Sequence, residues 1–192
     1  MANPRKKISL TALALIAAIG SIFPEVATAA SNKSKDAAPA PVSSQPSVTT
    51  ASFGDWTLRC VEGAGKDGGA ACEVIQSIVL SGQQAPVAKL ALGRLEATGG
   101  LQVTVVLPVN VALLSPATVS DDPAGKDAVA LTWQRCIPGG CFASAPAEDA
   151  MIAAWKAAST PGTLSFDDAS GRKVGLPFSL RGLTQALVAM QK

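Results

Sequence analysis

Four cysteines are the residues of this 192-residue chain whose type and spacing could do chemistry: Cys60, Cys72, Cys136 and Cys141. They could form disulfides, a zinc site or a redox centre. Structural zinc sites favour cysteines two to four residues apart, and redox centres favour C-x-x-C. Here eleven residues separate the first two cysteines and four separate the last two. This spacing and the even count favour two disulfides.

Three disulfide pairings are possible, and the residues between the cysteines favour one of them. The Ile-Pro-Gly-Gly segment between the last two cysteines suits a type II turn, because proline fixes φ and glycine supplies the positive φ that follows. Four glycines lie between the first two cysteines and permit a longer hairpin loop. The predicted bonds are therefore Cys60–Cys72 and Cys136–Cys141.

Other patterns that could support catalysis are weaker. The chain has no histidine, so a Ser-His-Asp or Cys-His arrangement is impossible. Ser170 and Lys173 have the S-x-x-K spacing of a serine nucleophile and its base, but they follow a turn signal, which favours a solvated turn. Three aspartates could gather around calcium, although they lack the spacing of an EF-hand: Asp121, Asp122 and Asp127. We expect no catalytic, cofactor-binding or metal site, and no enzymatic activity.

The cysteines lie on or beside segments that alternate between apolar and polar residues, which is typical of β-strands. Strands are predicted at 55–60, 72–80, 87–95, 101–107, 109–114, 129–136, 164–167 and 172–180. A helix is predicted to open near Pro146 and to end before Pro161, and a second short helix contains Leu183 and Leu187. We predict a mainly β fold, a β-sandwich with two short helices, with the three tryptophans in its core.

The N-terminal segment, residues 1–30, has the pattern of a signal peptide. A basic start is followed by the uncharged run Ile8–Ile22 and by small residues that permit cleavage after Ala29 or Ala30. The alternative, an uncleaved anchor, needs roughly 20 apolar residues, which is longer than this run. Residues 31–52 are rich in Ser, Ala and Pro, which predicts a disordered linker, and residues 53–192 are predicted to form one domain.

Removal of residues 1–30 would leave a neutral protein. The chain has 16 basic and 14 acidic residues, of which three basic and one acidic residue lie in the first thirty, so thirteen of each would remain. A neutral chain has no long-range attraction for nucleic acid. We therefore expect no nucleic-acid partner, and no integral membrane segment after signal cleavage.

Motifs at both ends of the predicted domain, taken with the cysteines, resemble the invasion-associated locus B family of exported bacterial proteins. The start is Phe53-Gly54-Asp55-Trp56, and a cysteine follows four residues later. The C-x4-C pair has Gly140 before its second cysteine. The chain closes with a segment from Phe178 to Leu187, in which Leu183 stands where a phenylalanine is common in the family.

The resemblance implies an immunoglobulin-like β-sandwich, structural disulfides at the four cysteines, and a location in the periplasm or at the cell surface. It implies no catalytic residues. We therefore expect a non-enzymatic periplasmic binding or accessory protein whose partner is an unknown envelope or host protein. One alternative is a secreted or surface factor that promotes adhesion to or invasion of host cells. Another is an enzyme with paired carboxylates, for which no pair stands out.

Overall fold

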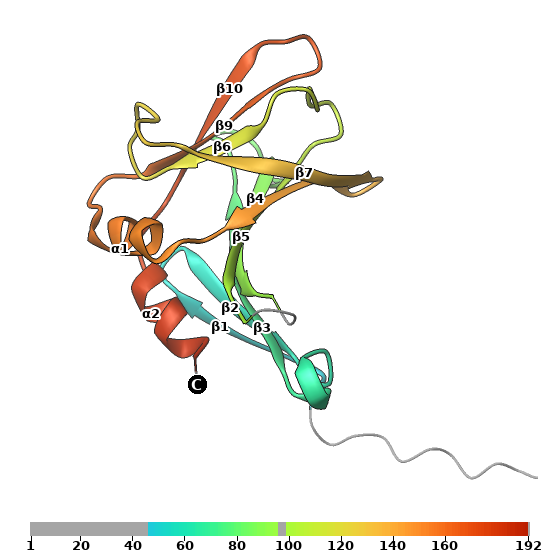
Figure 1. Ribbon diagram of the computed structural model, residues 1–192, viewed down its shortest axis with the longest axis vertical. Helices are drawn as coiled ribbons and strands as arrows, with labels where there is room; N and C mark the ends of the chain where they lie inside the picture. Colours follow the sequence, from blue (N-terminus) through green and yellow to red (C-terminus); the bar gives the residue numbers. More distant parts are fainter. Residues whose placement is uncertain (1–45, 96–98, 192) are drawn as a thin grey trace, which may run out of the picture. The chain divides into compact units, whose positions relative to one another are not determined.

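Ten β-strands and two α-helices make up the described part of the computed structural model, residues 46–95 and 99–191 (Figure 1). The predicted signal peptide and its cleavage sites at Ala29 and Ala30 lie outside the described residues. The strands are β1 (Val48–Phe53), β2 (Trp56–Val61), β3 (Ala71–Ile78), β4 (Ala88–Arg94), β5 (Leu101–Leu107), β6 (Ala117–Ser120), β7 (Val129–Ile137), β8 (Gly140–Pro146), β9 (Gly162–Asp167) and β10 (Lys173–Phe178). The helices are α1 (Asp149–Ala157) and α2 (Leu183–Ala189), and a 3-10 turn, Lys66–Gly68, lies between β2 and β3.

The strands form one antiparallel sheet in the order β1-β2-β3-β4-β5-β8-β7-β6-β9-β10. The predicted mainly β fold with two short helices is therefore confirmed. The finer prediction, an immunoglobulin-like sandwich, is not shown, because the strands are hydrogen-bonded into a continuous sheet.

The core lies on one face of this sheet and includes residues from both of its halves. Alternate side chains of β3, β4 and β5 are buried there together with side chains of β6, β9 and β10. As predicted, Trp56 and Trp155 are core residues, with 0% and 2% of their surface exposed. Trp155 of α1 packs on Phe178 of β10, with ring centroids 5.1 Å apart. Trp133 is half-buried and donates its indole N–H to the carbonyl oxygen of Ser115.

The structure differs from the predicted elements at four places, one of which is β6 (Ala117–Ser120), a strand that was not predicted. Strand β1 begins at Val48, inside the predicted linker, because its β-branched Val-Thr-Thr segment pairs with β2 along its whole length. The predicted strand 109–114 is a loop with an isolated bridge at Val111. Strand β8 occupies a segment, Gly140–Pro146, for which no strand was predicted, and α1 starts after it at Asp149.

The two helices, α1 between β8 and β9 and α2 after β10, pack against the strands. Ile152 and Trp155 bury one side of α1, and Leu183 and Leu187 bury one side of α2. Among the described residues, no helix is long and apolar enough to span a membrane.

Candidate functional site

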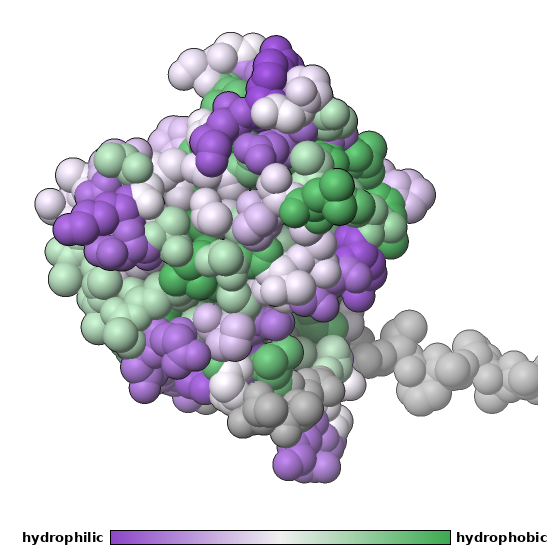
Figure 2. Space-filling view, turned by 45° about the horizontal axis from the view of Figure 1, so that its top comes forward, coloured by the Kyte–Doolittle hydropathy of each residue, from purple (hydrophilic) through white to green (hydrophobic). Residues whose placement is uncertain are grey.

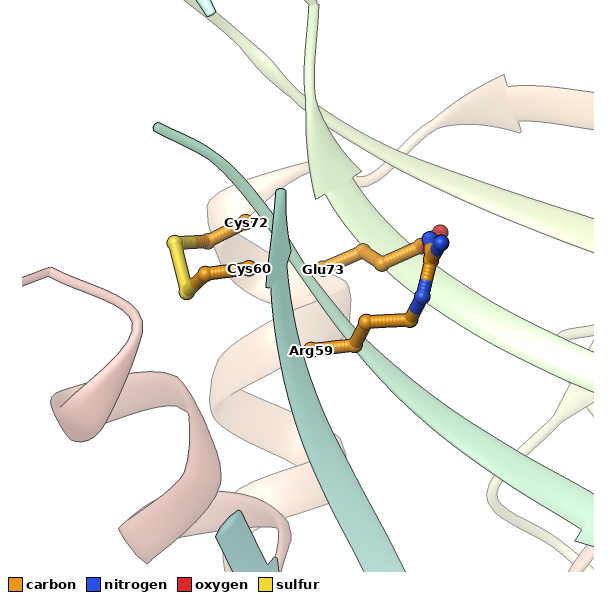
Figure 3. Close-up of a disulfide and its surroundings, with 4 residues drawn as sticks. All are labelled: Arg59, Cys60, Cys72 and Glu73. Carbon is orange, nitrogen blue, oxygen red and sulfur yellow. A yellow bond between two sulfur atoms is a disulfide. The ribbon is translucent and has the colours of Figure 1, made fainter. Parts of the chain in front are cut away.

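Both predicted disulfides, Cys60–Cys72 and Cys136–Cys141, are present. Cys60 and Cys72 lie opposite each other in the β2–β3 ladder, one position away from Arg59 and Glu73. Because successive strand side chains point to opposite faces, the disulfide and the Arg59–Glu73 pair lie on opposite sides of the two strands (Figure 3). Arg59 Nη1 lies 3.1 Å from Glu73 Oε1.

The Arg59–Glu73 ion pair borders a hollow of about 640 Å³ on the face of the sheet that points away from the core. The strand register explains its composition. Leu90 and Val105 pair with each other on the core side, so the next residues in each strand, Ala91 and Val106, face outward. The hollow is lined by apolar side chains of the sheet, by residues of three connections and by charged groups: Ile75, Ala91, Val106 and Phe142; Pro86, Pro108 and Gly139; Arg59, Glu73 and Lys89.

Two cations beside the apolar lining distinguish this hollow from an ordinary sheet face. The guanidinium carbon of Arg135 lies 5.1 Å from the centre of the Phe142 ring, in the geometry of a cation–π contact. Lys89 makes no ion pair with any other described residue. The arrangement can bind a partner that combines apolar groups with a negative charge.

A family model, Invasion associated locus B (IalB) protein, matches residues 56–191, which is more than half of the chain. The chain belongs to the IalB family. Its membership and its two disulfides indicate an extracytoplasmic protein.

One solved structure that this chain resembles is the crystal structure of invasion associated protein b from Bartonella henselae. The TM-score is 0.63 at 21% sequence identity, and the match covers 74% of this chain and 95% of that chain. At this identity the likeness shows the fold alone. No curated protein sequence matches the chain.

The two terminal motifs that suggested the IalB family contact each other. We call this contact, made by residues 53–56 and 179–182, the terminal clasp. Arg181 donates two hydrogen bonds to the Asp55 carboxylate, from Nε at 3.0 Å and from Nη2 at 2.6 Å. The Ser179 hydroxyl donates to Asp55 Oδ2 at 2.7 Å. These bonds lower the pKa of Asp55, with the Arg181 hydrogen bond first among the causes, and raise the pKa of Arg181.

Buried polar groups join the clasp to the core. Gln76, which is only 4% exposed, accepts from the Ser179 N–H at 2.8 Å and donates to the Ser179 carbonyl oxygen at 3.0 Å. The Trp56 indole N–H donates to the same carbonyl oxygen at 3.0 Å. Because every one of these buried groups has a partner, the clasp holds its two segments against the core.

The S-x-x-K pattern lies in the β9–β10 turn, and its serine is engaged there. The Ser170 hydroxyl and N–H both donate to Asp168 Oδ1, as does the N–H of Arg172. The Arg172 guanidinium donates to Asp168 Oδ2. These bonds hold the pKa of Asp168 far below its usual range, with the Ser170 hydroxyl as the largest cause. The serine thus organises a turn.

Asp168→Asn should lower the thermal unfolding midpoint more at pH 7 than at pH 2.5. The depressed pKa means that the carboxylate stabilises the fold above the unfolded pKa, about 3.9, and that this stabilisation is lost as the pH falls through the folded pKa. Thermal unfolding from pH 7 to pH 2.5 measures the difference. Asp167→Asn is the control, because that carboxylate accepts no hydrogen bond from the described residues. An equal difference between wild type and Asp168→Asn at both pH values would contradict the assignment.

The structure does not assemble a calcium site from the three aspartates. Asp122 Oδ1 accepts from the N–H of Ala124 at 2.6 Å and shapes its own turn. Asp121 and Asp127 line another hollow with Glu148, separate from the one on the sheet face. In the described ranges no group of three His, Cys, Asp or Glu side chains is placed to hold a metal ion.

Sequence reasoning missed the outer hollow and the terminal clasp. The residues of the hollow come from five strands, and their individual types carry no signal. The clasp had a signal: both segments combine a glycine with charged residues. Without the structure, nothing indicated that they meet across a sequence separation of 126 residues.

Proposed function

We propose that this protein is a non-enzymatic periplasmic binding or accessory protein that holds its partner against the outer hollow of the sheet. The single observation that carries the proposal is the hollow itself, with its apolar floor and its cations. Its volume falls within the range of roughly 300–1,000 Å³ that is usual for ligand sites. The absence of histidine from the chain and the engagement of Ser170 in its turn support a binding role over catalysis.

The composition of the hollow suits an extended partner segment with an acidic residue. The apolar side chains supply contact area on desolvation, and Phe142 under Arg135 is a fixed aromatic anchor. Lys89 would pair with the partner's carboxylate, which favours a defined orientation. The Arg59–Glu73 pair is already satisfied and would form part of the rim.

Site-specific photo-crosslinking in the native cell tests the proposal. A photoreactive amino acid in place of Ala91 should give a discrete envelope adduct, because Ala91 lies in the hollow. Phe142→Ala in the same chain should reduce that adduct by at least about fivefold, the effect of losing an interface anchor.

The matched control places the same photoreactive group at Ser165, which is also half-buried but lies on β9, outside the hollow. The Ser165 chain should not give the adduct. If neither chain gives an adduct, or if both give the same one, the hollow is not the binding site.

The alternative, a secreted or surface factor that acts on host cells, is supported by the family description and by the name of the similar Bartonella henselae protein. Fractionation of the native cell discriminates between the two. Recovery of the protein in the medium or at the outer surface would favour the alternative, and confinement to the periplasm would exclude it.

A further inference from the structure

Three connections of the sheet meet at one end of the strands. The register places the end of β3 beside the start of β4, and the end of β5 beside the start of β8. The β3–β4 loop (79–87), the β5–β6 loop (108–116) and the tip of the β7–β8 hairpin (137–140) therefore lie together. Pro86, Pro108 and Gly139, one from each connection, line the same hollow.

Large aliphatic side chains are exposed at this end, which we call the apolar end. Leu114 is fully exposed, Val109 is 62% exposed, and Leu113 is 53% exposed. Val79 and Ile137, from the other two connections, are 50% and 45% exposed. Five of the eight exposed large hydrophobic residues among the described residues thus lie on these three connections. Figure 2 shows strongly hydrophobic side chains gathered on one side of the molecular surface, beside hydrophilic ones. Soluble proteins rarely expose such groups together without an interaction to cover them.

Charges are distributed unequally between this end and the opposite end of β7. The β9–β10 turn is hydrogen-bonded to the β5–β6 loop and so belongs to this end. Together with the hollow and the β7–β8 hairpin, it carries five basic residues (Arg59, Lys89, Arg135, Arg172 and Lys173) and three acidic ones (Glu73, Asp167 and Asp168). The β6–β7 loop and α1, beyond the other end of β7, carry the opposite excess: Asp121, Asp122, Asp127, Glu148 and Asp149; Lys126 and Lys156. The excess of basic residues would attract an approaching negative surface to the apolar end.

We propose that the apolar end docks on an anionic phospholipid bilayer, with the loop leucines and valines inserted among the acyl chains near the headgroups. This role goes beyond partner binding in the hollow, and Arg135 borders both surfaces. Aliphatic residues on projecting loops, flanked by arginine and lysine, are the chemistry that interfacial membrane binding requires.

A protein partner fits the same residues less well. Energetic centres of protein interfaces are enriched in tryptophan, tyrosine and arginine, whereas leucine and valine are under-represented. The five exposed side chains of the apolar end are all leucine, isoleucine or valine. They project from three turns rather than from a continuous strand or helix face, which suits a fluid surface better than a matched rigid one.

Vesicle co-sedimentation tests the proposal with the chain as it is recovered from the envelope of the expressing cells. Wild type should bind vesicles of phosphatidylglycerol and phosphatidylethanolamine and should bind phosphatidylcholine vesicles weakly. Leu113→Ser combined with Leu114→Ser should weaken binding by roughly tenfold, because two inserted side chains lose their apolar contacts. Arg135→Gln should weaken it by roughly fivefold at low salt and less at high salt.

Val188→Ser is the matched control, because Val188 is 51% exposed but lies on α2, away from the apolar end. It should bind as wild type does. Binding that is the same for the double serine variant and for wild type would overturn the proposal, and so would failure of wild type to bind anionic vesicles. Loss of a protein adduct in the double variant without any vesicle binding would assign the apolar end to a protein partner instead. Circular dichroism of each variant checks that the fold is retained.

Discussion

Gly182→Ala should destabilise the protein by about 4 kcal/mol, the largest effect that we expect from a single methyl group. Gly182 has φ +91°, a conformation that side chains disfavour. A Cβ there would also overlap the carbonyl oxygen of Phe53, in the tight turn that joins β1 to β2. The strand backbone on the other side of this contact is held by the β1–β2 ladder, so it cannot move away without breaking hydrogen bonds.

Gly171→Ala is the control that separates the clash from the backbone conformation. Gly171 has φ +80°, and a Cβ there would meet no atom within 4 Å. Gly171→Ala should therefore lower the stability only by the cost of the backbone conformation, roughly 1–2 kcal/mol. Urea unfolding followed by tryptophan fluorescence measures both variants. Equal losses of stability would show that the terminal clasp tolerates a side chain at Gly182.

Removal of the Cys60–Cys72 disulfide should cost about 3 kcal/mol, the second large effect. The bond links two strands across a connection of eleven residues that holds four glycines, so its loss increases the entropy of the unfolded chain. We expect this loss of stability for the double variant Cys60→Ala, Cys72→Ala. The Cys136–Cys141 bond closes a shorter loop and should contribute less, about 2 kcal/mol.

Urea unfolding with and without a reductant measures the effect of the disulfide. In an oxidising buffer the double variant should be less stable than wild type. Reductant should lower the stability of wild type more than that of the variant, because wild type has two disulfides to lose. The two reduced proteins should then be similar in stability. A variant as stable as oxidised wild type would contradict a stabilising role for Cys60–Cys72.

The strands that the sequence predicts best are those with alternating burial. In β2, Trp56 and Leu58 are buried while Thr57 is not, and this period of two is visible in the sequence alone. The disulfides were predictable for a related reason: each pair of cysteines is consecutive in the chain and flanks turn-forming residues.

Strand β8 could not be predicted in this way. Its sequence, Gly-Cys-Phe-Ala-Ser-Ala-Pro, has no β-branched residue, yet it lies in the middle of the sheet between β5 and β7. Small side chains such as Ala143 are buried there. The position in the sheet, which depends on distant strands, outweighs the local preference.

The predicted strand 109–114 failed for the opposite reason. Its apolar residues favoured a strand, but Val109, Leu113 and Leu114 face solvent and only Val111 enters the core. The outer hollow could not be predicted either, because it depends on the relative register of five strands. Alternation identifies the face on which Ala91 lies but not its neighbours on adjacent strands.

The terminal clasp joins segments that leave a membrane pore at very different times when a chain is exported with its N-terminus first. Asp55 lies near the start of the described residues and Arg181 near their end, so the β1–β2 hairpin can make these contacts only when residues 179–182 are present. Each disulfide, in contrast, joins consecutive cysteines and can form as soon as its own hairpin has emerged. A chain that crosses a membrane with its N-terminus first would thus arrive already cross-linked but still open, and it would close only after its last segment had passed through.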